Sequence, residues 1–542
     1  MKKELVERLI GKDVKDLSFW EEKFPQRSAG IVTRVAPSPT GFMHIGNMIA
    51  AVIPERFAHK NNGVFMLRIE DTDTKRKVDG AVDLVISSLN DFGIVPDEGP
   101  VSETKEVGNY GPYFQSQRTD IYKSGIKYLL ENDLGYPCFC TEEELDQARK
   151  EQTALKMRPG YYGKWAKYRN APEELIEKLL DEGKPYIFRF RAGGEWDKKR
   201  YFDDVTKGKV LMPENDIDIV IMKSDGLPTY HFAHAIDDHF MRTTHVIRGD
   251  EWLASLPLHI QLFEAFGWTP PKYAHIAPIQ KLDDGNRRKL SKRKDPEANI
   301  SYYFEQGYPV EAIKEYLINL ANSNFEDFKK ANPVNPIENF DFKLENLNNS
   351  GALLDFKKLD NISKEFIATL SSSELYDRLL IWAEQYDEKL AKKLKENKDY
   401  IKSILAIERD GVEKVRKDFY ILSKINEEIS FFFNDEFSFD KKDFPVSEEF
   451  VKEILNAYIP TYNHSANKEE WFENVKETAA KSGYAKNAKE KDKDPEAYKG
   501  TVSDVATILR VLITGRTQSP DLYAIMQILG KDETLKRLKA GL

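Results

Sequence analysis

One segment near the start of the chain restricts the possible folds more than any other. Residues 31–35 (IVTRV) are mostly β-branched and apolar, as in a buried strand, and the loop 36–41 (APSPTG) follows them. An apolar stripe predicts a helix from about residue 44 to 60, and residues 64–69 (VFMLRI) predict a second strand. Strand–loop–helix–strand opens a doubly wound nucleotide-binding fold. The sequence therefore predicts an α/β fold with a Rossmann-type sheet here.

The turn between this strand and helix has the residue types of a phosphate site. Pro37 and Pro39 stiffen the loop, and Gly41 permits an unusual backbone angle. His44 and Asn47 lie three residues apart, so on a helix they share one face near its N-terminus, where free N–H groups attract phosphate. A single histidine in such a turn is usually only structural. The proline-rich loop upstream favours a catalytic role here.

A basic run later in the chain is the second candidate. Residues 287–294 (RRKLSKRK) follow the turn-forming segment 283–286 (DDGN), which predicts a loop just after the last strand of the sheet. By itself such a run usually forms a solvated or nucleic-acid-binding surface. Strand ends in an open α/β sheet, however, face the ligand crevice, so lysines on this loop could close over phosphates.

Composition limits the class of protein more than it identifies a partner. The 542 residues predict three to five structural units, and no run of eighteen apolar residues predicts a membrane span. Residues 1–15 are charged throughout, unlike a secretory signal. The two cysteines, Cys138 and Cys140, exclude a disulfide framework and suit a reducing cytosol. The net charge of −9 leaves room for a local basic face.

Taken together, the two candidate segments resemble a known family. Residues 44–47 (HIGN) and 289–293 (KLSKR) resemble the two signature motifs of class I aminoacyl-tRNA synthetases, although histidine is more common than Asn47 at the end of the first. Residues 34–41 (RVAPSPTG) and 67–73 (LRIEDTD) resemble the glutamyl branch of that family. Further similar segments span the chain: 224–231, 237–239, 246–252 and 512–516.

The resemblance implies a set of functional residues. The catalytic set comprises His44, Asn47, Lys289 and Lys292. The ATP-binding set comprises Pro37, Thr40, Gly41, His44, Gly46, Asn47, Leu290, Ser291, Lys292 and Arg293. The glutamate-binding set comprises Arg34, Ser38, Glu70, Tyr230, His234 and Arg248, with His234 standing where many relatives have asparagine. Arg34 and Arg248 suit carboxylates because a guanidinium donates in a bidentate fork.

The resemblance also implies an architecture and partners. ATP, Mg²⁺, L-glutamate and tRNA(Glu) are the expected ligands, bound tRNA is expected to be needed for the first step, and a cytoplasmic monomer without membrane contact is expected. An all-helical C-terminal region should read the anticodon. The expected divisions are a helical extension (1–29), a first catalytic half (30–111), an acceptor-end insertion (112–215), a second catalytic half (216–300), a stem-contact region (301–370) and a helical anticodon-binding region (371–542).

Structural zinc and three rival functions can be weighed from the sequence. Some relatives bind zinc through a Cys-x-Cys pair and two downstream ligands, but Trp165 and Lys167 stand where the second pair would be, so no zinc is expected.

The loop 36–41 disfavours a glutaminyl enzyme, which is the first of three rival functions. The long continuation to residue 542 disfavours a short paralogue that modifies a tRNA base. The presence of His44, Lys289 and Lys292 disfavours a non-catalytic tRNA-binding protein. Misacylation of tRNA(Gln) stays open.

Overall fold

The structure is a computed structural model that describes the 542-residue chain except residues 29, 42, 74–75, 77, 292 and 334–335. It divides into two compact units. The first contains residues 1–302 and 314–355, and the second contains residues 303–313 and 356–542. The chain thus passes between the units three times.

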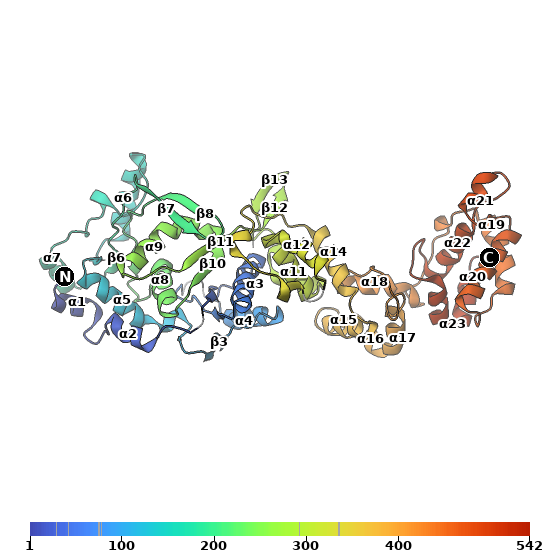
Figure 1. Ribbon diagram of the computed structural model, residues 1–542, viewed down its shortest axis with the longest axis horizontal. Coiled ribbons are helices and arrows are strands. Elements are labelled where there is room, and N and C mark those ends of the chain that lie inside the picture. Colours follow the sequence, from blue (N-terminus) through green and yellow to red (C-terminus); the bar gives the residue numbers. More distant parts are fainter. Residues whose placement is uncertain (29, 42, 74–75, 77, 292, 334–335) are drawn as a thin grey trace. The chain divides into compact units, whose positions relative to one another are not determined.

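The predicted strand–loop–helix–strand is present in the first unit, and its helix is labelled α3 in Figure 1. Strand β1 (Val32–Val35) pairs in parallel with β2 (Val64–Leu67), and α3 (Ile45–Lys60) connects them. All four residues of β1 are buried, which explains its continuous apolar character. The apolar stripe of α3 is also buried, as expected of a helix that covers one face of a sheet.

A second parallel pair lies beside the first. Strand β10 (His245–Gly249) pairs with β11 (Lys272–Ile276), and α9 (Leu256–Ala265) connects them. The N–H of Thr244, just before β10, donates to the carbonyl of Val32 at 2.9 Å, which joins the two pairs. One connection leaves β1 and the other leaves β10, so the boundary between these strands is the switch point at which doubly wound folds bind ligands.

The segment between the two parallel pairs forms antiparallel sheets. Here one prediction is wrong in its topology: the strand expected over 217–222 is present as β9 (Val220–Met222), but it pairs antiparallel with β6 and closes the insertion instead of resuming the parallel sheet. A buried apolar run does not reveal its pairing partner. The other elements of this segment are α4 (Ala81–Asp91), β3 (Gly99–Ser102), β4 (Lys105–Val107), α5 (Thr119–Glu131), β5 (Gly135–Cys138), α6 (Glu142–Ala154), α7 (Glu173–Asp181), β6 (Ile187–Phe190), β7 (Lys199–Asp204), β8 (Gly208–Pro213) and α8 (Tyr230–Phe240).

The second basic motif begins on a strand, which corrects the prediction of a loop. Strands β12 (Gln280–Asp283) and β13 (Asn286–Lys289) form an antiparallel hairpin. Asp284 and Gly285 form its two-residue turn with positive φ angles of 47° and 79°, as a tight hairpin requires. Charged residues on both faces of β13 conceal the strand pattern in the sequence.

The predicted N-terminal helical extension packs on the insertion. It contains α1 (Lys3–Ile10) and α2 (Leu17–Lys23). The indole N–H of Trp20 donates to the Ser124 hydroxyl at 2.8 Å, and the Tyr186 hydroxyl donates to the Leu9 carbonyl at 2.8 Å. Their apolar faces join one buried core with α5 and α8. The extension is therefore an integral part of the first unit.

The rest of the chain is helical, as predicted. No described helix of either unit is long and apolar enough to cross a membrane. An apolar core runs through the second unit from Ile367 to Leu538. The helices after β13 are α10 (Ile300–Gln306), α11 (Val310–Ala321), α12 (Asn324–Ala331), α13 (Pro336–Asn339), α14 (Phe356–Ile367), α15 (Ser372–Tyr386), α16 (Glu388–Glu396), α17 (Lys398–Leu405), α18 (Ile425–Ile429), α19 (Glu448–Tyr458), α20 (Lys468–Lys481), α21 (Ala488–Lys493), α22 (Val502–Thr514) and α23 (Leu522–Lys539).

Candidate active site

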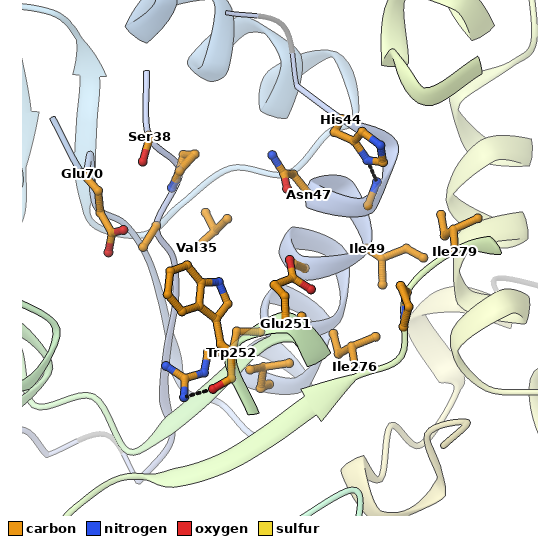
Figure 2. Close-up of a pocket in the computed structure, with 18 of the residues that line it drawn as sticks. Val35, Ser38, His44, Asn47, Ile49, Glu70, Glu251, Trp252, Ile276 and Ile279 are labelled. Carbon is orange, nitrogen blue, oxygen red and sulfur yellow. Dashed lines mark hydrogen bonds between the residues drawn. The ribbon is translucent and has the colours of Figure 1, made fainter. Parts of the chain in front are cut away.

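A cavity of about 470 Å³ opens at the carboxyl ends of β1 and β10, the switch point of the sheet. Figure 2 shows Ser38 and Glu70 on one side of it and His44 and Ile279 on the other. Most of the residues predicted for substrate binding or catalysis line it: Arg34, Pro37, Ser38, Thr40, His44, Gly46, Asn47, Glu70, Tyr230, Arg248, Lys289 and Leu290. Gly41, His234, Ser291 and Arg293 are outside the lining, and Lys292 lies outside the described residues.

His44 caps the N-terminus of α3 at one side of the cavity. Its Nδ1 accepts a hydrogen bond from the Gly46 N–H at 2.9 Å. A neutral imidazole in this position carries its proton on Nε2, which can donate to a ligand. Asn47 lies on the first turn of the same helix, and Gly41 has the predicted unusual angle, φ 106°. This end of the cavity therefore combines side-chain donors with a helix N-terminus, an arrangement that suits phosphate.

The other side is built on a buried ion cluster. Arg34 donates to both oxygens of Asp238, from Nε at 3.1 Å and Nη2 at 3.3 Å. Arg68 donates to Asp238 Oδ1 at 2.8 Å and to Glu70 Oε1 at 3.1 Å. The Glu70 N–H in turn donates to the Pro37 carbonyl at 3.0 Å, which ties β2 to the first motif loop. Arg34 thus reaches the cavity with only part of its charge matched by Asp238, which it shares with Arg68.

The two carboxyl groups of this cluster differ in their electrostatic environment. Burial raises the pKa of Glu70 above its usual value, and Arg68 and Arg34 only partly offset the effect. Burial also acts to raise the pKa of Asp238, but Arg34 and Arg68 outweigh it and hold that pKa well below the usual value. Asp238 is therefore a fixed anion, whereas Glu70 gains from an additional cation, such as an ammonium group.

Arg248 lines the same side but has neutral partners. Its Nε donates to His275 Nε2 at 3.0 Å, one terminal nitrogen donates to His259 Nδ1 at 3.1 Å, and the other donates to the Trp252 carbonyl at 3.3 Å (Figure 2 shows the last bond). Among the ion pairs between described residues, none includes Arg248. A buried guanidinium held only by neutral acceptors favours an anionic ligand.

Two aromatic rings form a wall next to Arg248. Tyr230 and Trp252 stack with ring centroids 4.0 Å apart and an interplanar angle of 30°. Burial raises the pKa of Tyr230, so its hydroxyl stays protonated and can donate. Trp252 was not among the predicted site residues, although it ends the motif 246–252 that carried part of the resemblance.

His234 lies behind this wall instead of in it. Its side chain is fully buried and stacks behind Tyr230. Its Nε2 is 2.9 Å from the Tyr273 hydroxyl, and its Nδ1 is 2.7 Å from Asp238 Oδ2. His234 was predicted to bind glutamate, but it lies outside the cavity lining and instead contacts Asp238 and packs against Tyr230.

The second motif contributes Lys289 and Leu290 to the lining. Lys289 Nζ lies 3.2 Å from a carboxylate oxygen of Glu251, another lining residue that was missed in the sequence. Asp295 holds the hairpin in place by accepting from both terminal nitrogens of Arg288 at 2.7 Å and from the Ser291 N–H at 2.8 Å. The basic run therefore divides into a structural arginine and a lysine that faces the cavity.

Apolar lining residues from strands β1, β10 and β11, from α3 and from the segment before β12 were also missed. They were hidden because nothing in a short apolar run distinguishes a cavity wall from the core. They are Val35, Ile49, Ile247, Ile276 and Ile279.

The cysteine pair lies in the insertion. Cys138 Sγ and Cys140 Sγ are each 3.4 Å from the Tyr161 hydroxyl. Within the described part of the chain, no cluster of three or more His, Cys, Asp or Glu side chains could hold a metal ion. The absence of structural zinc stays a prediction.

The geometry agrees with comparisons to known proteins. Residues 30–361 match the catalytic domain of class I tRNA synthetases for glutamate and glutamine (E and Q), and residues 496–542 match an anticodon-binding domain. The chain is 46% identical to the glutamate–tRNA ligase of Acetivibrio thermocellus over 99% of each chain, and 43% identical to that of Sorangium cellulosum over 96% of each.

A solved structure extends the likeness to the fold. The glutamate tRNA ligase of Elizabethkingia meningosepticum, in complex with its amino acid, is 30% identical and superposes with a TM-score of 0.76 over 94% of this chain and 99% of that one. The catalytic-domain match, the near full-length relatives and the site at the switch point together show that this chain belongs to the glutamate–tRNA ligase family of class I aminoacyl-tRNA synthetases.

Proposed function

We propose that this site joins L-glutamate to ATP, giving glutamyl-adenylate and pyrophosphate, and then transfers the glutamyl group to the 3′ end of tRNA(Glu), releasing AMP. One observation supports this most strongly. The cavity places a buried arginine with neutral partners, Arg248, in the same space as the helix N-terminus capped by His44. The first favours a carboxylate and the second favours phosphate, so both substrates have a place.

The glutamate end has three kinds of contact to offer. Arg248 and Arg34 can donate to carboxylate oxygens, and Glu70 can accept from the α-ammonium. The hydroxyls of Tyr230 and Ser38 add hydrogen bonds. These contacts hold a carboxylate oxygen of glutamate so that it can attack the α-phosphorus of ATP, a contribution of positioning.

The ATP end stabilises charge during that attack. His44 Nε2, Asn47 and Lys289 supply donors for the phosphate oxygens as pyrophosphate leaves, and Lys292 is assigned the same role from the sequence alone. Pro37, Thr40, Gly46 and Leu290 supply the walls for the nucleotide, with Gly41, Ser291 and Arg293 shaping the adjoining loops. No protein nucleophile is needed, because hydrogen-bond donors held at fixed positions stabilise the charge that develops in the transition state and so accelerate the reaction.

Magnesium fits this end as an ion carried by the triphosphate. Mg²⁺ prefers oxygen ligands and is usually held by phosphates with one or two carboxylates. Glu251 is the half-exposed carboxylate of the lining next to Lys289 and would be its ligand from this chain. When bound, the ion neutralises phosphate charge.

Two measurements test the proposal. ATP–pyrophosphate exchange with glutamate should require added tRNA, and aminoacylation should occur with purified tRNA(Glu). The same assay with tRNA(Gln) decides the open question of misacylation. We also expect a cytoplasmic location and a monomeric state, and light scattering of the purified protein checks the second.

The rival amino acid gives a sharper control. Glutamine would leave the charge of Arg248 unmatched, a penalty of roughly 1–3 kcal/mol or more. The kcat/KM for glutamate should therefore exceed that for glutamine by about five-fold or more. Equal values for the two would refute the proposed specificity.

A further inference from the structure

A chain of buried side chains leads from the insertion to the substrate cavity. Asp204, the last residue of β7, accepts from His275 Nδ1 at 2.6 Å, and His275 Nε2 accepts from Arg248 Nε at 3.0 Å. All three side chains are buried, with relative exposures of 3%, 0% and 5%. Only Arg248 lines the cavity. The chain therefore acts on the ligand through Arg248 alone.

The direction of the hydrogen bonds follows from the chemistry of the groups. A guanidinium only donates, so His275 Nε2 must be the unprotonated, accepting nitrogen. Its Nδ1 then carries the proton and donates it to Asp204. Burial lowers the pKa of His275, although Asp204 opposes the shift, so the imidazole is neutral at physiological pH. The Asp204 carboxylate thus fixes the tautomer that Arg248 needs.

A second chain holds the opposite edge of the guanidinium. His259 Nδ1 accepts from Arg248 at 3.1 Å, which leaves its Nε2–H to donate to His231 Nδ1 at 2.9 Å. The Trp252 carbonyl takes a third N–H. Each nitrogen of the guanidinium thereby has at least one acceptor. Because arginine has five N–H groups, at most two, on the terminal nitrogens, are left for a ligand.

We propose that Asp204 and His275 are positioning residues for glutamate selection: they fix the plane of the Arg248 guanidinium so that its remaining N–H groups meet the substrate carboxylate. This inference rests on the proposed function and names residues that act in it without touching substrate. Neutral imidazoles achieve the orientation without an adjacent carboxylate that would compete with the substrate for Arg248.

The Asp204→Asn variant tests the orientation directly. Asp204 Oδ1 accepts from the backbone N–H groups of Thr206 at 3.0 Å and Lys207 at 2.9 Å. These donors would hold the amide oxygen of the asparagine there, so its NH₂ would face His275 Nδ1. His275 would then carry its proton on Nε2, facing the N–H of Arg248, and the two donors would repel. A tautomer reversal of this kind is severe where a histidine must accept at one defined nitrogen.

The expected result is selective for glutamate. In aminoacylation assays the KM for glutamate should rise by about ten-fold or more, because a buried donor loses its acceptor. The preference for glutamate over glutamine should fall, whereas the KM values for ATP and tRNA should stay within about two-fold. Asp203→Asn is the matched control, because Asp203 is the adjacent, exposed residue of β7 and its substitution removes the same charge.

A second pair of variants keeps the inference falsifiable if Asp204→Asn does not fold. His275→Gln retains an oxygen that can accept from Arg248 and an NH₂ that can donate to Asp204, whereas His275→Leu retains neither. The glutamate KM should rise more in the leucine variant than in the glutamine variant.

Three outcomes would distinguish a positioning role from a purely structural role and from failure of the proposed function itself. An unchanged glutamate KM and glutamine preference in both Asp204→Asn and His275→Leu would overturn the positioning role. A lower kcat and thermal midpoint with an unchanged KM would also overturn it, because that is the behaviour of a structural residue. Failure of the unaltered protein to charge tRNA with glutamate would refute the proposed function instead.

Discussion

Arg34 and Arg68 share the carboxylate of Asp238, with their nitrogens 3.1 Å and 2.8 Å from the same oxygen, Oδ1. All three side chains are buried. One carboxylate therefore neutralises part of each guanidinium charge, and Arg68 also pairs with Glu70 at 3.1 Å and with Asp237 at 3.8 Å. This arrangement fixes Arg34 at the cavity wall before any substrate arrives.

Removal of that shared charge should destabilise the first unit strongly. The Asp238→Asn variant leaves two buried cations short of a partner, a change that typically costs about 3–5 kcal/mol. Calorimetry should show a lower unfolding midpoint for the first unit. Asp225→Asn is the control, because Asp225 forms a partly exposed pair with Lys223 at 3.2 Å and such pairs contribute about 0–1 kcal/mol. A shift no larger than that of the control would contradict the ion cluster's structural role.

The first unit should lose stability as the pH is lowered, at pH values that are still above the range in which carboxylates titrate. Burial, with a smaller effect from Lys272, lowers the pKa of His245 to about 4. A histidine in the unfolded chain has a pKa of about 6.5. Between these values the unfolded chain binds a proton that the folded chain does not. Stability therefore falls as pH falls from about 6.5 to 4.

The contribution of this one histidine can be isolated. At pH 5 the loss is roughly 1–2 kcal/mol after allowance for screening. Unfolding midpoints at pH 7.5 and 5.0 should differ less in His245→Gln than in the unaltered protein. An equal or larger difference in the variant would show that His245 titrates normally in the folded state.

The zinc-free state is a separate prediction. Structural zinc requires four ligands, and the Cys138 and Cys140 thiols face the Tyr161 hydroxyl. Elemental analysis of protein purified without chelator should give well under one zinc per chain. A stoichiometric zinc signal that disappears in Cys138→Ser would contradict it.

How much of this site was predictable depends on the distance over which its contacts act. The run β1–α3–β2 was predicted because apolar strands, a stiff loop and a helix stripe are local patterns. The pairing of β9 and the strand β13 were not, because a short apolar run hides its partner and a charged strand hides its pleat. His275 and Asp204 are 71 residues apart, and only the folded sheet brings them together. Family motifs supplied Arg248, but its neutral partners came from the tertiary structure.

The last prediction concerns the division of labour between the two ends of the cavity. Lys289→Ala should reduce kcat far more than it weakens glutamate binding. Lys289 belongs to the second motif, while glutamate is expected to meet Arg34 and Arg248. A charge that strengthens its contact as pyrophosphate leaves lowers the barrier without tightening the ground state. Loss of one such donor typically costs about 10²–10³ in kcat, or roughly 2.7–4 kcal/mol.

The competing view is that Lys289 only touches tRNA phosphates. That view predicts a raised KM for tRNA, relieved at low salt, with kcat nearly intact, since phosphate contacts weaken as salt rises. Steady-state kinetics at two salt concentrations separates the two, and Lys294→Ala, at an exposed basic residue of the same segment, is the control. Lys292→Ala is expected to behave as Lys289→Ala on sequence grounds. An unchanged kcat with a salt-sensitive tRNA KM would refute the catalytic role, because a residue that stabilises the leaving pyrophosphate must act on the chemical step.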